Sequence, residues 1–195
     1  LGDHVWTIYR DSDDVLCMGT NGGGLKRYDK GKVISIRKSH GLLSDIVADI
    51  LEDANGIFWI TSDKGIFSVS KKGLNELAAG KIDRVISSSY GKADGLKTAE
   101  CDYGFQPASW KSPDGKLWFP TFNGISMIDP QHITKNTIAP PVAIEEFTVD
   151  DKTLAAETTP VILQPGRKRF EFHYTALSFR VPERVKFRYK LEGYD

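Results

Sequence analysis

The sequence has few of the residues that build several common kinds of site. Among its 195 residues are two cysteines and four histidines, and no histidine lies two or four positions from a cysteine or from another histidine. Local support for a zinc site is therefore lacking. No serine occupies a G-x-S-x-G elbow and no glycine-rich loop precedes a Lys-Ser/Thr pair, so neither acyl transfer nor P-loop chemistry is supported. We expect no catalytic residue, no cofactor and no metal.

An excess of charge of one sign and a long apolar run are also absent. The 26 basic and 26 acidic residues cancel, so nothing in the balance attracts nucleic acid or an anionic membrane. No apolar run approaches the ~20 residues that a membrane helix needs. The N-terminus shows no charged-then-apolar signal segment. We expect any signal peptide or membrane anchor to lie outside this sequence.

What the sequence does contain is a repeated hairpin. Residues 55–70 (NGIFWITSDKGIFSVS) and 114–129 (DGKLWFPTFNGISMID) each place a turn pair, a Trp, a Gly and an Ile at the same spacing. Residues 13–29 form an earlier copy in which Cys17 stands at the Trp position. Alternating apolar residues around turn residues predict strand, tight turn and strand in each copy. Trp59 and Trp118 are therefore predicted to pack within sheets, and Cys17 to be a small buried hydrophobe.

A second mark recurs with the hairpins and supports a repeat architecture. GLLSD at 41–45 and GLKTAE at 95–100 both place Gly-Leu-x-Ser/Thr ahead of a hairpin. The spacing from Cys17 to Trp59 falls within the ~40–45 residues of a four-stranded propeller blade. The spacing from Trp59 to Trp118 is longer because the connections are lengthened, one of them by the helix-like LNELAAG and another around CDYGFQP. Cys101 lies in that second insertion, and its pairing with Cys17 is left open.

The pattern changes after Asp129-Pro130. Pro140-Pro141 cannot continue a helix or a central strand, which makes the pair a natural domain junction. Beyond it, apolar residues alternate with period two in segments at 142–149, 170–174 and 185–191, which predicts short strands with one buried face. Short strands separated by turns indicate a β-sandwich of immunoglobulin type, with fewer strands than such a domain usually has.

These residues carry a family resemblance. The hairpins, with GLLSD and DGLKTAEC, resemble two-component regulator propeller repeats. The segment from PPVAIEEF through FEFHYTALSF to PERVKFRYKLEGYD resembles the start of the three-tyrosine domain that follows such propellers. The fold is accordingly predicted to be all-β. Residues 1–138 are predicted to be the C-terminal blades, about three, of a partial β-propeller, and 139–195 the N-terminal part of a truncated immunoglobulin-like β-sandwich.

The resemblance implies a non-catalytic extracytoplasmic sensor module: the periplasmic portion of an inner-membrane receptor that binds a ligand and relays it to an output domain. Two rival functions stay open, a propeller-based polysaccharide lyase or hydrolase and a protein-interaction scaffold. The expected partners are a small-molecule or oligosaccharide ligand and a second copy of the protein, bound through the sandwich domain or the open propeller edge. No nucleic-acid partner is expected, and contact with a membrane is expected only through a segment outside this sequence.

The lengthened loop at 99–110 (AECDYGFQPASW) is the candidate ligand site. It combines carboxylates with aromatic side chains, a mixture suited to stacking on a sugar ring and accepting its hydroxyls. Its candidate residues are Glu100, Asp102, Tyr103, Phe105 and Trp110. The plainer interpretation, which we favour, is that the loop packs the last blade against the sandwich, with Tyr103 and Trp110 in a core.

Overall fold

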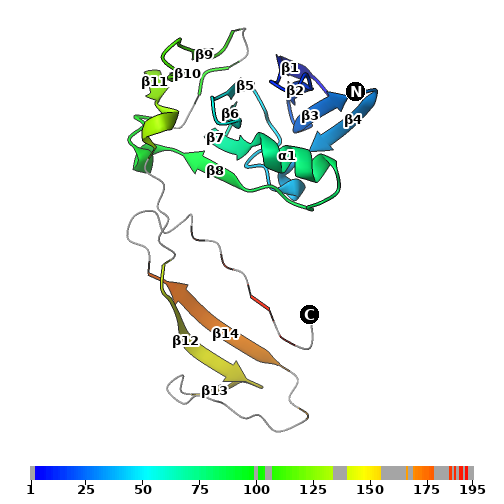
Figure 1. Cartoon of the computed structure of the whole chain (residues 1–195). Coiled ribbons are helices and arrows are strands. Elements are labelled where there is room, and N and C mark those ends of the chain that lie inside the picture. Colours follow the sequence, from blue (N-terminus) through cyan, green and yellow to red (C-terminus); the bar gives the residue numbers. More distant parts are fainter. Residues whose placement is uncertain are drawn as a thin grey trace. The chain divides into compact units, whose positions relative to one another are not determined.

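The computed structural model describes residues 3–98, 101–103, 107–133, 140–154, 166, 169–177, 185, 187, 189–190 and 192 (Figure 1). The chain divides into two compact units, Leu1–Ile133 and Thr134–Asp195. The described strands are arranged in antiparallel sheets, three in the first unit and one in the second. None of the described helices is long and apolar enough to cross a membrane.

Each sheet of the first unit is a meander, in which every strand pairs with the next strand along the chain. Sheet 1 has the order β1-β2-β3-β4, with β1 Val5–Arg10, β2 Leu16–Thr20, β3 Leu25–Asp29 and β4 Lys32–Ile36. Sheet 2 has the order β5-β6-β7-β8, with β5 Asp49–Glu52, β6 Ile57–Ser62, β7 Gly65–Ser70 and β8 Ser87–Tyr90. Sheet 3 has the order β11-β10-β9, with β9 Trp110–Lys111, β10 Leu117–Thr121 and β11 Gly124–Ile128. The three predicted hairpins are thereby confirmed.

The predicted helical insertion is also confirmed, although it begins earlier than the sequence pattern indicates. Helix α1 spans Lys71–Ala78 and follows β7 directly (Figure 1). It begins at Lys71 because the hydroxyl of Ser70 accepts a hydrogen bond from the backbone N–H of Gly73 at 3.0 Å, which caps the helix. Leu74 is fully buried and attaches the helix to the core.

The turn pairs adopt the left-handed backbone that the sequence predicts. The φ angle is +69° at Gly56 and +85° at Gly115, and in the first copy Asp14 takes the same role at +65°. Asp and Asn are among the few residues that tolerate this region without glycine's freedom.

The Gly-Leu mark has a physical explanation. Gly41 and Gly95 have φ angles of 98° and 92°, and each ends a 3₁₀-helix, Lys38–His40 or Lys92–Asp94. Each glycine N–H donates to the carbonyl of the first helix residue. Leu42 and Leu96, which follow these glycines, then enter two different core clusters. The mark is thus a helix stop followed by a core anchor.

Two apolar clusters hold the three sheets together. The first joins sheets 1 and 2 and includes Cys17, Leu25, Phe58, Ile60, Phe67 and Val69. The second joins sheets 2 and 3 and includes Trp59, Ile66, Cys101, Leu117, Phe119 and Ile128. Trp59 is 2% exposed, which confirms that it is a packing residue. Cys17 and Cys101 are buried in different clusters, and burial raises the pKa of each thiol to about 12.

A buried carboxylate links the same three sheets through their first strands. Asp49 on β5 accepts a hydrogen bond from the hydroxyl of Thr7 on β1 at 2.9 Å. It accepts another from the hydroxyl of Ser109, the residue before β9. All three side chains are buried, so these bonds form away from water. An unpaired buried carboxylate is costly, and the two hydroxyls meet part of its need for partners.

The described part of the second unit is one antiparallel sheet of order β13-β12-β14, with β12 Val142–Val149, β13 Lys152–Leu154 and β14 Phe170–Ala176. Phe147 and Phe172 face each other across the strands with ring centroids 4.6 Å apart. The predicted strands at 142–149 and 170–174 are confirmed. The third predicted strand, at 185–191, lies largely outside the described residues.

Candidate functional site

A polar side chain begins the turn of the central hairpin. The Asp53 carboxylate accepts hydrogen bonds from the N–H groups of Asn55 and Ile57 at 2.8 and 3.0 Å. Its other oxygen accepts the indole N–H of Trp59 at 2.9 Å. One side chain therefore shapes the turn and fixes the repeat tryptophan.

The third hairpin repeats this arrangement with a hydroxyl. Ser112 occupies the position of Asp53, and its Oγ accepts a hydrogen bond from the indole N–H of Trp118 at 3.2 Å. The single hydroxyl proton is shared between the Asp114 carboxylate and the Lys116 carbonyl, which lies 3.0 Å away. Asp114, in the turn itself, pairs with the Lys116 ammonium at 2.7 Å. This hydrogen bond, together with one from Ser112, lowers the pKa of Asp114 to about 2.

The first hairpin has a different partner. Asp11 accepts the N–H groups of Asp13 and Val15, each at 2.9 Å, but no indole is present because Cys17 replaces the tryptophan. The second carboxylate oxygen of Asp11 instead accepts a hydrogen bond from Nη2 of Arg27 at 3.1 Å. Arg27 lies opposite Cys17 in the strand register, and its side chain is 3% exposed. A buried arginine thus occupies the place where the other hairpins put a tryptophan ring.

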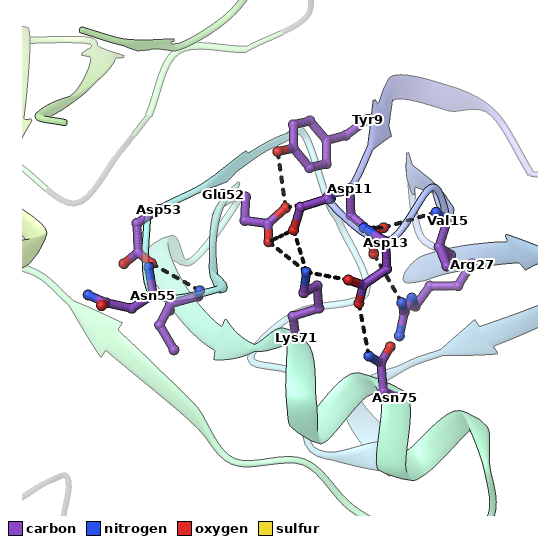
Figure 2. A network of polar contacts seen from close by, with 12 residues as sticks. Tyr9, Asp11, Asp13, Val15, Arg27, Glu52, Asp53, Asn55, Lys71 and Asn75 are labelled. Carbon is purple, nitrogen blue, oxygen red and sulfur yellow. Dashed lines mark hydrogen bonds and ion pairs between the residues drawn. The ribbon is translucent and has the colours of Figure 1, made fainter. Parts of the chain in front are cut away.

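The β1–β2 turn, the end of β5 and the start of α1 meet in a polar network between sheets 1 and 2 (Figure 2). Lys71, at the start of α1, forms ion pairs with Glu52 and Asp13, both at 3.1 Å. Glu52, at the end of β5, accepts hydrogen bonds from the Ser12 hydroxyl at 2.8 Å and the Tyr9 hydroxyl at 3.3 Å. The network joins the β1–β2 turn, the end of β5 and helix α1.

Burial and charge set the protonation of this network. Burial alone would raise the pKa of Glu52, but hydrogen bonds from Ser12 and Lys71 outweigh it and hold the pKa below its usual value. Burial raises the pKa of Tyr9, and the nearby Glu52 carboxylate raises it further. Burial alone would lower the pKa of Lys71, but the bonds to Glu52 and Asp13 outweigh it and raise the pKa. At neutral pH Glu52 is therefore a carboxylate, Tyr9 a neutral phenol and Lys71 an ammonium. These protonation states suit hydrogen bonding to a ligand better than proton transfer.

The network lines an open depression of about 480 Å³. Its wall includes Tyr9, Ser12, Glu52, Asn55 and Lys71, and Lys111 reaches it from sheet 3. The Lys111 ammonium donates to the carbonyl of Glu52 at 2.8 Å, so all three sheets contribute. A second depression of about 330 Å³ adjoins Lys71 on the side of α1. Hydroxyl, amide, carboxylate and ammonium groups together match a polar, hydroxylated ligand.

Asp102 and Trp110, two of the predicted loop residues, lie along one edge of β10. The backbone N–H of Asp102 donates to the carbonyl of Pro120 at 3.0 Å, and Trp110 pairs with Trp118 in the strand register. Tyr103 is half-buried against the second cluster, and its ring lies 5.2 Å from that of Trp6. Trp110 is 57% exposed, which is not the exposure of a core residue. Glu100 and Phe105 lie outside the described residues.

The sequence pattern did not identify the polar network. The recurring residue at Asp11, Asp53 and Ser112 was a usable signal, because it stands at one spacing before each Trp or Cys. Glu52 and Lys71 carry no such signal, since their pairing depends on how two sheets pack. In the described part of the chain, no group of three or more His, Cys, Asp or Glu residues is placed to hold a metal.

Comparison with known proteins places this fold among bacterial extracellular domains. No family model and no curated protein matches the chain. The extracellular domain of BT3049, described as a hybrid two-component system of B. thetaiotaomicron, is 17% identical with a TM-score of 0.55, over 88% of this chain and 23% of that one. Two structures of the extracellular domain of BT4673, described as a one-component and as a hybrid two-component system of the same organism, are each 24% identical over 65% of this chain and 17% of theirs, with TM-scores of 0.51 and 0.52. The chain thus shares the fold of a part of these domains and spans less than a quarter of their length.

Proposed function

We propose that this chain is part of the extracytoplasmic sensor region of a two-component-type receptor, in the periplasm and anchored in the inner membrane by another segment. In this proposal it is not catalytic; it binds a ligand, and an output domain outside the chain reads the result. The observation that carries the proposal is the shared fold with the extracellular domains of BT3049 and BT4673.

We propose further that sheets 1, 2 and 3 are consecutive blades of a β-propeller, and that the second unit begins a three-tyrosine sandwich. The repeated strand order and the repeated packing of one sheet on the next support the first part. The antiparallel pairing of β12 with β14, in which apolar residues recur at every second position, supports the proposal of a three-tyrosine sandwich.

Two places on the first unit are proposed to contact the ligand. One is the predicted loop edge, represented by Asp102 and Tyr103. The other is the depression, represented by Ser12 and Lys111. An oligosaccharide fits both, because each offers hydrogen-bonding groups beside an aromatic ring, Tyr103 in the first and Tyr9 in the second.

A thermal-unfolding screen of the chain against oligosaccharides and small metabolites tests ligand binding. A ligand at 100 times its Kd is expected to add about 2.7 kcal/mol of stability. Lys111→Met is expected to abolish that gain if the depression binds, and Tyr103→Phe with Asp102→Asn to abolish it if the loop edge binds. Ile86→Ala, at an exposed residue that lines neither depression and is not in the loop, is the control.

The screen also separates the rival functions. No shift with any compound would contradict ligand capture by this part of the chain and favour a protein partner. Conversion of a bound oligosaccharide to a shorter product would contradict the non-catalytic proposal. A ligand shifts a conformational equilibrium by the difference in its affinity for the two conformations. A ligand that acts as the signal should therefore change the output of cells that carry the whole receptor when it is added to them.

A further inference from the structure

Helix α1 is the place where sheet 2 departs from the repeat. In sheet 1, β3 ends at Asp29 and β4 begins at Lys32, so residues 30–31 alone join these strands. In sheet 2 the same connection runs from Ser70 to Ser87 and contains α1. Residues of this insertion line the depression of about 330 Å³: Lys71, Lys72, Asn75, Glu76 and Lys81. The insertion therefore builds a wall that the repeat itself does not have.

The two depressions adjoin and together form one groove, which we name the α1 groove. Asn55, Gly56 and Lys71 line both depressions, so the two share a wall. Helix α1 lines the smaller depression, and Lys111 reaches the larger one from sheet 3. The groove is thus formed by turns, strand ends and a helix of the first unit.

The carboxylates on the walls of the α1 groove already have partners. Glu52 pairs with Lys71 at 3.1 Å, and Glu76 lies 3.9 Å from the ammonium of Lys72. Asp53 accepts the hydrogen bonds of its own hairpin with both oxygens. A ligand in the groove therefore meets little uncompensated negative charge.

Two lysines on the same walls lack such a counter-ion. Lys81 and Lys111 are both exposed, and within the described part of the chain neither forms an ion pair. Lys111 donates one hydrogen bond, to the carbonyl of Glu52 at 2.8 Å, which leaves the other N–H donors of its ammonium for a ligand. The uncompensated charge of the groove is therefore positive, one ammonium in each depression.

Neutral hydrogen-bonding groups accompany these two charges. Asn55, which is common to both depressions, has an exposed side-chain amide that donates and accepts hydrogen bonds. Tyr9 adds the face of an aromatic ring in the larger depression, and Asn75 adds a second amide in the smaller one. Amides and an aromatic face are suited to sugar hydroxyls and to the apolar face of a sugar ring, whereas ammonium groups are suited to anionic substituents.

We propose that the α1 groove binds an acidic oligosaccharide, whose carboxylate or sulfate groups pair with Lys81 and Lys111 while its hydroxyls bind Asn55. The inference rests on the proposed function at one point, that the depression beside Lys111 is a ligand site, and it adds the charge of the ligand. Because the two lysines lie in different depressions, a ligand that pairs with both carries at least two acidic groups. An uncharged oligosaccharide uses the amides and the ring but gains nothing from the ammonium groups.

Isothermal titration calorimetry at pH 7 with oligosaccharides of equal length tests the proposal. The probes are an oligogalacturonate, which carries carboxylates, a carrageenan oligosaccharide, which carries sulfates, and a malto-oligosaccharide, which carries neither. We expect at least one acidic probe to bind at least about tenfold more tightly than the uncharged probe, and the tighter of the two identifies the acidic group. Raising the salt concentration from ~0.05 M to ~0.5 M should weaken this binding, because salt screens exposed charges.

Variants of the two lysines locate the binding. Lys81→Gln and Lys111→Gln should each weaken the acidic probe at least about fivefold, and the double variant by about the product of the two factors. Lys111→Arg keeps the charge and should retain most of the affinity. Lys64→Gln is the matched control, because it removes the same charge from a side chain that is 62% exposed and lines neither depression. It should leave binding unchanged, and circular dichroism checks the folding of every variant.

Two results would overturn the inference and leave ligand capture standing: binding of the uncharged probe as tightly as the acidic ones, or acidic binding that survives loss of both lysines. Equally tight binding of a single-stranded DNA oligonucleotide would also overturn it, by showing attraction to any polyanion. If none of the probes binds, the inference is wrong, whereas the sensor proposal is decided by the wider screen and by the output of the whole receptor.

Discussion

The first hairpin shows how one residue exchange alters its neighbours. In sheet 2, a large Trp59 lies opposite a small Ser68; in sheet 1 the sizes are reversed, with Cys17 opposite Arg27. The acidic turn residue is kept in both hairpins, so its second oxygen binds an indole in sheet 2 and a guanidinium in sheet 1. The two pairs are thus alternative ways to fill one volume and satisfy one carboxylate.

This equivalence predicts a coupled pair of substitutions. Arg27→Ser alone leaves the fully buried Asp11 carboxylate without its charged partner and should cost about 3–5 kcal/mol of unfolding free energy. Cys17→Trp alone overpacks the site and should cost roughly 1–3 kcal/mol. The double variant supplies an indole for Asp11 and space for its ring, so its loss, measured by urea denaturation, should be clearly smaller than the sum. Simple additivity of the two losses would contradict the idea of exchangeable pairs.

Glu52 predicts a pH dependence of stability. A carboxyl group whose pKa is lower in the folded chain contributes stability above its unfolded pKa of about 4.3, and loses it as the pH falls through the folded value. Glu52→Gln should therefore lower the unfolding free energy at pH 7 by about 1.5–3 kcal/mol. The difference from the unmodified chain should shrink progressively below pH ~4, because both side chains are then neutral.

A matched substitution on α1 controls for loss of an acidic side chain. Glu76 pairs with the exposed Lys72 at 3.9 Å, and such surface pairs contribute little. Glu76→Gln should change stability by less than about 0.5 kcal/mol at either pH. A pH-independent loss in Glu52→Gln, or an equal loss in both variants, would show that the charge of Glu52 does not stabilise the fold.

Among the elements, the two Gly-Leu marks look alike in the sequence but differ in surroundings. Gly41 and Gly95 share a left-handed backbone. A Cβ atom on Gly41 would lie 2.1 Å from the carbonyl oxygen of Val85, whereas one on Gly95 would meet nothing within 4 Å. Gly41 therefore allows the segment that leads into β8 to pack closely against the first mark. In the described residues, Gly95 makes no such close contact.

Alanine substitution separates backbone strain from the close approach. Gly95→Ala should cost the left-handed penalty alone, about 1–2 kcal/mol. Gly41→Ala should cost this and roughly 1–3 kcal/mol more, because the Val85 backbone must move. Urea denaturation of both variants measures the difference; equal losses would mean that the contact with Val85 adjusts freely.

Elements were predictable from sequence to the extent that local chemistry decides them. The hairpins and the left-handed turn at Asp14 follow from alternation and turn residues, and a helix was expected at LNELAAG; its earlier start at Lys71 depends on the Ser70 cap, which the prediction did not use. The pairing of Cys101 and Trp110 with β10 did not follow, because it is a contact between segments distant in the sequence. Trp110 was expected in a core or at a ligand, and only the strand register shows that it lies beside Trp118 on an exposed face.

At the scale of the whole molecule, the repeat predicted how many hairpins form but not what joins them. The buried Asp49, with Thr7 and Ser109, and the pairing of Lys71 with Glu52 and Asp13 both connect different sheets. Polar residues in such positions look like surface residues in a sequence. Their roles emerge only once the sheets are stacked, which is why composition and spacing could not find the network.

The strictly consecutive pairing of strands also bears on how the chain is made. Since each sheet of the first unit uses only neighbouring strands, its strands can pair as soon as they leave the ribosome, before the next sheet that completes their apolar core has been made. Until the next sheet emerges, each new sheet leaves uncovered the apolar face that carries its Trp or Cys position. A pause in translation between two sheets would therefore leave an adhesive apolar surface in the crowded cell, and the interval between successive hairpins becomes a quantity on which successful synthesis depends.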